Sequence, residues 1–144
     1  MIWPFTLKKP AESENHMYYS GKIYFTLEEQ ACPCCGVINV ARDFLEDLSA
    51  LREAAGHPLA VNSMCRCKKH NEAEGGAKGS FHLITNSFGC CAADISTSGW
   101  DGGKKWRFAK IAMSYGFSIG VAKTFIHVDQ RRKYTGADPV LYNY

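Results

Sequence analysis

The pattern of hydrophobic and polar positions along the chain predicts three helices. Residues 26–29 have the Thr-Leu-Glu-Glu order of a capping box, which starts a short helix. A longer helix is expected between Asn39, which can cap it, and Gly56, which can end it. Its apolar residues recur at helical spacing and form one face: Phe44, Leu45, Leu48 and Leu51. The third helix, over 104–115, is expected to bury side chains from the set Trp106, Ala109, Ile111 and Met113 before Gly116 stops it.

Runs of β-branched, aromatic and small apolar residues predict strands between these helices. They cover residues 59–62, 91–95, 117–121 and 125–128, and the last two form a hairpin-like pair. This order of elements predicts an α+β fold, with a small antiparallel sheet and helices packed on one side. Residues 1–17 are largely polar and unpatterned and predict a flexible arm, so that residues 18–144 form a single domain.

Composition and charge narrow the class of protein. The 144 residues are 46% hydrophobic and 22% charged, as expected for one soluble globular domain. A net charge of +3, without basic runs interleaved with aromatic residues, argues against nucleic acid as a partner. The basic residues at 131–133 are interpreted as a solvated strand end. No stretch approaches the ~20 apolar residues of a membrane span, and the apolar N-terminus is too short for a signal peptide. We expect a monomer that is made in the cytoplasm.

Three residues have the chemistry and the local setting of a catalytic zinc site. His82 follows a glycine-rich segment that predicts a loop. Asp94 closes a run of small apolar residues, where a carboxylate is costly to bury unless it is paired or bound to metal. His127 lies in a strand-like segment whose period of two places Asp129 on the same face. Two imidazoles and one carboxylate leave a fourth position for water, although each residue alone also fits a core histidine or a capping aspartate.

At these residues the chain resembles the zinc D-alanyl-D-alanine carboxypeptidases and the related phage peptidoglycan endopeptidases. The resemblance covers residues 24–129 and rests on segments that follow one another in the family's order. These are Tyr-Phe-Thr-Leu-Glu-Glu-Gln-Ala-Cys at 24–32, Val-Asn-Ser-Met-Cys-Arg-Cys-Lys-Lys-His-Asn at 61–71, Gly-Gly-Ala at 75–77 with Ser-Phe-His at 80–82, Ala-Ala-Asp-Ile at 92–95, and Phe-Ile-His-Val-Asp at 125–129.

The resemblance implies a hedgehog/DD-peptidase fold and a zinc peptidase that cuts the stem peptides of bacterial peptidoglycan. It implies that His82, Asp94 and His127 bind the catalytic zinc and that Arg66 holds a substrate carboxylate and takes part in catalysis. Ser80 is expected to donate a hydrogen bond to substrate in the cleft, or to complete the glycine-rich turn. Without an export signal, such an enzyme would reach the cell wall after release during phage lysis. The bond it cuts, by carboxypeptidase or by endopeptidase cleavage, stays open.

Two departures from the family pattern affect the site. The family motif Ser-x-His-x-x-Gly-x-Ala-x-Asp sets the first two ligands closer together, whereas His82 and Asp94 are twelve positions apart. An insertion within 84–89 accounts for the difference and is expected to affect the shape of the cleft. Several relatives carry an acid three positions before the last ligand, where this chain has Thr124. Asp129 then either accepts the proton or orients a ligand imidazole. The alternative is a relative that binds zinc and a cell-wall peptide or a protein partner without catalysis.

Seven cysteines are many for a chain of this length. Two clusters could together hold a second, structural zinc ion: Cys32, Cys34 and Cys35, and Cys65 and Cys67. Cys32 and Cys35 have the spacing of a zinc knuckle, but Cys65 and Cys67 are one residue too close for a matching second half. A disulfide and free buried thiols are the alternatives, and a thiol-based redox or metal-storage protein is a third functional class. Cys90 and Cys91 are expected to pack in the core.

Overall fold

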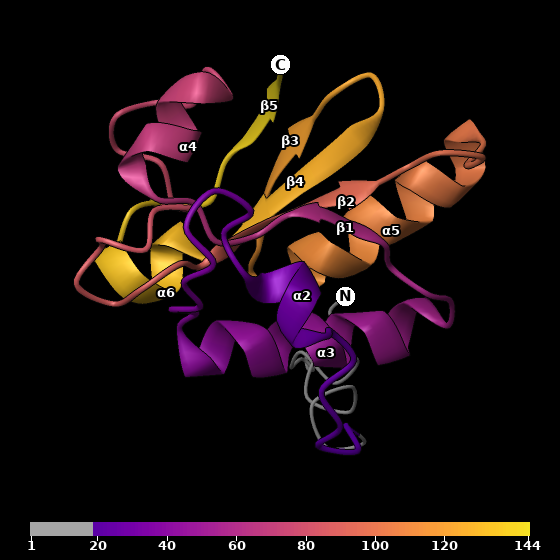
Figure 1. The fold of residues 1–144 in the computed structure, drawn as a ribbon. Coiled ribbons are helices and arrows are strands. Elements are labelled where there is room, and N and C mark those ends of the chain that lie inside the picture. The colour runs from indigo at the N-terminus through magenta and orange to yellow at the C-terminus, as the bar shows by residue number, and fades with distance from the viewer. Residues whose placement is uncertain (1–18) are drawn as a thin grey trace.

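The fold combines a five-stranded sheet with short helices, as a computed structural model of residues 19–144 describes it (Figure 1). The helices are α2 (Leu27–Gln30), α3 (Arg42–Ala55), α4 (Lys68–Ala73), α5 (Gly102–Ser114) and α6 (Arg131–Thr135). The strands are β1 (Val61–Ser63), β2 (Ala92–Ser96), β3 (Ser118–Val121), β4 (Phe125–Asp129) and β5 (Leu141–Asn143). The predicted arm, residues 1–17, lies outside the described residues. None of the helices within 19–144 is long and apolar enough to cross a membrane.

The strand order is β1-β2-β4-β3-β5. Neighbouring strands are antiparallel except for β3 and β5, which are parallel. The predicted α+β class with a small, mainly antiparallel sheet is therefore confirmed. The central pair, β2 and β4, sets Asp94 directly opposite His127. Two residues 33 positions apart in sequence thereby become neighbours.

The two faces of the sheet have different roles. Ile95, Ile126 and Val128 point into the hydrophobic core, where they meet buried side chains of α3 and α5. The alternate positions of β2 and β4 carry Asp94 and His127, which line a cleft on the opposite face. The period-two separation of core and chemistry predicted for 124–129 is confirmed. Residues at the end of α4 and the start of α6 also line this cleft.

The helix predictions hold in outline and fail in detail. The capping box at Thr26 starts α2, and Gly56 ends α3 with a φ of 78°. Asn39 does not cap α3, which begins after Ala41, because its side-chain amide donates instead to the carbonyl of Ile84 at 2.7 Å. Asp101 caps α5 three residues before the predicted start.

The buried face of α5 also differs from the prediction. Of the predicted set, Ile111 packs against the core, but Trp106 and Met113 are 63% and 46% exposed, and the fully buried residues are Phe108 and Ala112. Both sets fit a helical period, and packing against α3 and β3 selects between them. The predicted strand at 59–62 begins two residues later, as β1 at Val61. Residues 131–133 open α6 and do not extend a strand.

Candidate active site

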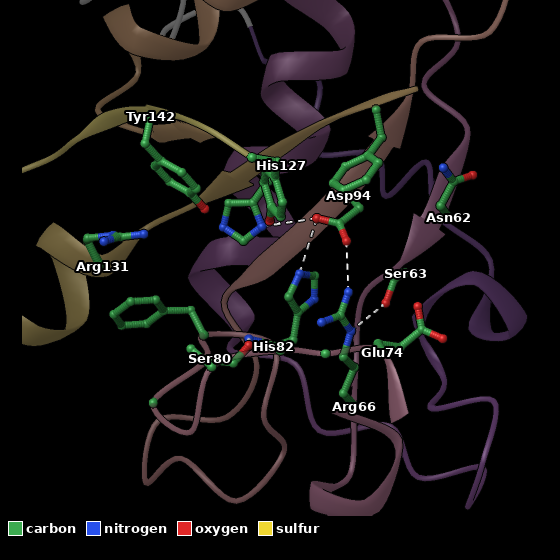
Figure 2. Close-up of a pocket in the computed structure, with 17 residues that line it drawn as sticks. Asn62, Ser63, Arg66, Glu74, Ser80, His82, Asp94, His127, Arg131 and Tyr142 are labelled. Atoms are coloured by element: carbon green, nitrogen blue, oxygen red, sulfur yellow. Dashed lines mark hydrogen bonds and ion pairs between the residues drawn. The ribbon is translucent and has the colours of Figure 1, made fainter. Parts of the chain in front are cut away.

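The three predicted metal ligands meet at the floor of the cleft (Figure 2). Asp94 comes from β2, His127 comes from β4, and His82 is delivered by the glycine-rich loop before it. One potential ligand atom from each residue lies within 4.8 Å of the other two. All three residues are buried, at 2–4% exposure. The grouping that the sequence predicted is thus present.

The ring nitrogen of His82 that points away from Asp94 determines the tautomer of the ring. His82 Nδ1 lies 2.7 Å from the backbone carbonyl of Met64, which can only accept, so Nδ1 carries the hydrogen. In the neutral ring, Nε2 is then a bare lone pair, and it faces Asp94 Oδ1 at 3.2 Å. Burial lowers the pKa of His82, which favours this neutral form.

His127 is held in the same way by a carboxylate. Its Nε2 donates to Asp129 Oδ2 at 2.7 Å, and its Nδ1 faces Asp94 Oδ1 at 3.0 Å. Burial alone would lower the pKa of His127, but the carboxylates of Asp129 and Asp94 outweigh it and raise that pKa. Burial would likewise raise the pKa of Asp94, but the neighbouring rings of His127 and His82 lower it. Asp94 is therefore an anion between two imidazoles.

This donor set fits a zinc ion. With their outer nitrogens occupied, both rings turn their inner nitrogens toward the same carboxylate oxygen, and a cation at this point would meet one ligand atom from each of the three residues. Two imidazole nitrogens and one carboxylate oxygen are a usual set for catalytic zinc. The carbonyl and carboxylate behind the rings are the partners that metal-bound histidines ordinarily have.

Asp129 lies behind His127, away from the cleft. It is fully buried and does not line the cleft. Its oxygens accept four hydrogen bonds, three from the backbone and guanidinium of Arg131 and one from His127. A carboxylate has about four acceptor sites, so these partners occupy all of them. Although burial would raise its pKa, the hydrogen bonds from His127 and Arg131 lower the pKa of Asp129 to about 2.

Arg66 is buried, at 8% exposure. Its guanidinium donates from Nη2 to Asp94 Oδ2 at 2.9 Å, from Nε to Ser63 Oγ at 3.0 Å, and from Nη1 to Asn71 Oδ1 at 3.3 Å. A guanidinium has five N–H groups, so one remains on each terminal nitrogen. Arg66 lines the cleft beside Asp94 (Figure 2).

The cleft has a volume of about 740 Å³ and contains residues that the sequence did not single out. Glu74 lines the side near Arg66, and Arg131 lines the opposite side (Figure 2). Tyr142 and Tyr144 lie beside His127, with ring centroids 6.1 and 6.4 Å from its ring. The basic residues at 131–133 were the one sequence signal that could have indicated a role for Arg131 in the cleft. Nothing in the sequence connects β5 or Glu74 with the ligands.

Tyr142 reaches the cleft because β3 has a glycine opposite it. A Cβ on Gly120 would lie 2.6 Å from the Tyr142 ring, closer than van der Waals contact allows. The ring therefore rests on the bare backbone of β3. Burial raises the pKa of Tyr142, so its phenol stays protonated at neutral pH. The ring of Tyr144 lies beside it, with the two centroids 5.5 Å apart.

The insertion, Thr124 and Ser80, which the sequence analysis also singled out, differ in whether they line the cleft. The insertion, residues 84–89, does not line the cleft, and it packs elsewhere through stacking of Phe88 on Tyr134 at 5.2 Å. Thr124 is exposed and also lies outside the cleft lining. Ser80 does line the cleft, and its hydroxyl accepts a hydrogen bond from the backbone N–H of His82 at 3.1 Å.

Comparison with known proteins places the chain in a family. A search of curated proteins finds no match. A sequence model of the family described as Peptidase M15 matches residues 23–129, which contain every ligand of the candidate zinc site and Arg66, Glu74 and Asp129. This match covers most of the chain, and it ends just before α6 and β5. The chain belongs to the peptidase M15 family.

Proposed function

We propose that this protein is a zinc-dependent peptidase that hydrolyses a peptide bond in peptidoglycan stem peptides. The observation that carries the proposal is the convergence of His82 Nε2, Asp94 Oδ1 and His127 Nδ1 at the floor of an open cleft. Their outer partners turn these atoms toward one another, where all three could bind one cation. Membership of the peptidase M15 family supports zinc peptidase chemistry and a peptidoglycan-related substrate at the level of the family.

The zinc ion, when bound, would lower the pKa of a bound water toward ~7 and polarise the scissile carbonyl. The protein's own residues keep the site in shape. Met64 and Asp129 each fix one ligand ring by a hydrogen bond to its outer nitrogen. Because all acceptor sites of Asp129 are engaged, we assign it a positioning role behind His127, the second of the two roles that the sequence left open.

Glu74 is our candidate for the general base. Among the described residues, two carboxylates line the cleft, Asp94 and Glu74, and Asp94 is already engaged by two histidines and Arg66. The Glu74 side chain is 51% exposed, and its nearest ionic partner is His70 at 4.0 Å. It is therefore free to turn toward a water and accept its proton, which neither Thr124 nor the saturated Asp129 can do.

Two guanidinium groups suit a substrate that carries carboxylates, as peptidoglycan stem peptides do. Arg66 has one unused N–H on each terminal nitrogen, enough to bind both oxygens of a carboxylate. Arg131 uses Nε and Nη2 on Asp129, and its guanidinium lies over the rings of Phe81 and Tyr142 at the other side of the cleft. We assign Arg66 to the carboxylate nearest the scissile bond, because it also touches the ligand Asp94.

A second candidate function is recognition of a cell-wall peptide without cleavage. Thr124 favours this function. It occupies the sequence position at which several relatives have an acid, and it is exposed and does not line the cleft. In that case the zinc site would bind the peptide without activating water, and Glu74 would have no part in proton transfer.

Digestion of purified peptidoglycan, followed by mass spectrometry of the soluble products, tests both functions. We expect the zinc-loaded protein to release fragments, and His82→Ala to release none. The matched control is His57→Ala, which removes a histidine that lies beside Trp100, outside the cleft. Free D-alanine among the products would identify a carboxypeptidase, and larger peptides would identify an endopeptidase. Zinc-dependent binding to peptidoglycan without any product would replace the peptidase by the recognition function.

A further inference from the structure

A second cluster of metal-binding side chains lies outside the cleft. The sulfur atoms of Cys32, Cys35 and Cys67 are all within 4.8 Å of one another, and none of the three residues lines the cleft. Cys32 and Cys35 belong to the turn after α2, and Cys67 immediately precedes α4. We propose that these three thiolates bind a structural zinc ion, with Cys34 as the fourth ligand.

The turn that carries the first two sulfurs has the shape of a metal knuckle. Gly36 adopts a φ of +75°, a conformation that side chains rarely adopt. Gly36 N donates to Cys32 O at 2.7 Å, and Cys32 N donates to Val37 O at 3.0 Å, so the turn closes on itself. The two cysteines are separated by two residues, as in many structural zinc sites. The turn therefore presents both sulfurs to the same side.

Backbone N–H groups point at the sulfur atoms. Cys67 N donates to Cys32 Sγ at 3.3 Å, and His70 N donates to Cys67 Sγ at 3.4 Å. Backbone N–H donors of this kind suit sulfurs that carry negative charge, as thiolates bound to a metal do.

Of the other cysteines, Cys34 lies near the cluster and Cys65 does not. Cys34 is not among the sulfurs that all lie within 4.8 Å of one another, but it is exposed in the same turn and near Cys67, so a small movement would let it complete a tetrahedral set. Cys65, which the sequence grouped with Cys67, faces elsewhere: its sulfur accepts from Asn39 N at 3.4 Å and lies near the buried thiol of Cys90. All seven cysteines are free, so the sulfurs have formed no disulfide that would compete with a metal.

The position of this site gives it a structural purpose. Cys67 directly follows Arg66, so a metal here would tie the turn after α2 to the segment that presents Arg66 to the cleft. The chain is otherwise joined at this point by hydrogen bonds, such as Cys65 N to Gln30 O at 3.2 Å. The structural ion would thus hold one wall of the cleft without touching the substrate.

Metal content and cobalt spectra of the full chain test the proposal. We expect two zinc ions per molecule, and a thiolate-to-cobalt charge-transfer band in the near ultraviolet after exchange into Co²⁺. Cys35→Ser should lose one zinc and the band, whereas His82→Ala should lose the other zinc and keep the band. Cys91→Ala, which removes a buried thiol outside the cluster, is the matched control and should keep both. A cobalt-loaded protein without the band would overturn the site, whatever happens at the cleft.

If Cys35→Ser fails to fold, the number of reactive thiols in the native protein provides a second test. The native zinc-loaded protein should protect its cluster thiols from a thiol reagent until a chelator is added, and zinc should appear as they react. After denaturation with chelator, seven thiols should react, whereas five would reveal a disulfide and overturn the proposal. Cys34→Ser should weaken the charge-transfer band, and an unchanged spectrum would remove Cys34 from the ligand set.

Discussion

The two clusters that can hold metal differ in what surrounds their ligand atoms. At the histidine–aspartate cluster, the partners behind the ligands are hydrogen-bond acceptors, Met64 O and the Asp129 carboxylate, and the front is an open cleft. At the cysteine cluster, the partners are backbone N–H donors, and no member lines the cleft.

The difference in hydrogen-bond partners suits a reactive site at the histidine–aspartate cluster and a structural site at the cysteine cluster. Acceptors behind the imidazoles hold hydrogens on the outer nitrogens, so the inner nitrogens face the metal position, and the open cleft leaves room in front for water and substrate. Backbone N–H donors around the sulfurs suit thiolates bound to a metal. Four sulfur ligands would leave no position on that metal for water. Arg66 connects the two regions, because it touches Asp94 and adjoins Cys67. The following changes test this division of labour.

The largest effect is expected from removal of a cleft ligand. His127→Ala should reduce peptidoglycan hydrolysis to the background level, because it removes a zinc ligand and leaves Asp129 facing a void. Cys35→Ser should lower the Tm and keep measurable turnover, since it lies outside the cleft. Product release and thermal unfolding of both variants are the measurements. If the two variants lost turnover equally at full zinc occupancy of the cleft, the division between the clusters would be wrong.

Glu74→Gln tests the proposed base. We expect kcat to fall by ~100-fold or more, the usual cost of removing a general base, with zinc content unchanged. The matched control is Glu72→Gln, which changes an exposed carboxylate in α4 that does not line the cleft. A Glu74→Gln variant with normal kcat would show that another group accepts the proton.

Asp129→Asn tests the positioning role behind His127. We expect a ~10- to 100-fold loss of zinc affinity, with turnover restored by added zinc, because an amide is a weaker acceptor for the ring N–H. Zinc titration and kcat on the same variant are the measurements. Retained zinc affinity with a ~100-fold lower kcat would make Asp129 the base after all.

Arg66→Lys is expected to have the smallest of these effects. An ammonium keeps the charge but cannot serve Asp94, Ser63 and substrate together, so kcat/KM on a peptide with a free carboxylate should fall by about 10-fold. A peptide whose carboxylate is amidated should lose activity with the wild-type protein and show little further loss with the variant. Equal losses on both peptides would mean that Arg66 acts only on Asp94.

The sequence predicted the elements whose signals are local. The capping box at Thr26, the stop at Gly56 and the alternation around His127 depend on a few neighbouring residues, and each is confirmed. Predictions that depended on distant partners failed: Asn39 binds Ile84, and α5 buries Phe108 in place of Trp106. In both cases the sequence offered two locally acceptable arrangements, and contacts with other elements chose one.

By itself, the sequence determined which residue types were available for zinc, that a loop presents His82, and that His127 and Asp129 share a face. Only the tertiary structure decided how they are used. The pairing of β2 with β4 sets Asp94 against His127, Arg131 engages the Asp129 carboxylate from α6, and Glu74 enters the cleft from the end of α4. The physical reason is that side-chain direction follows from local backbone geometry, whereas charge pairing and acceptor saturation depend on segments that are far apart in sequence and meet only when the chain folds.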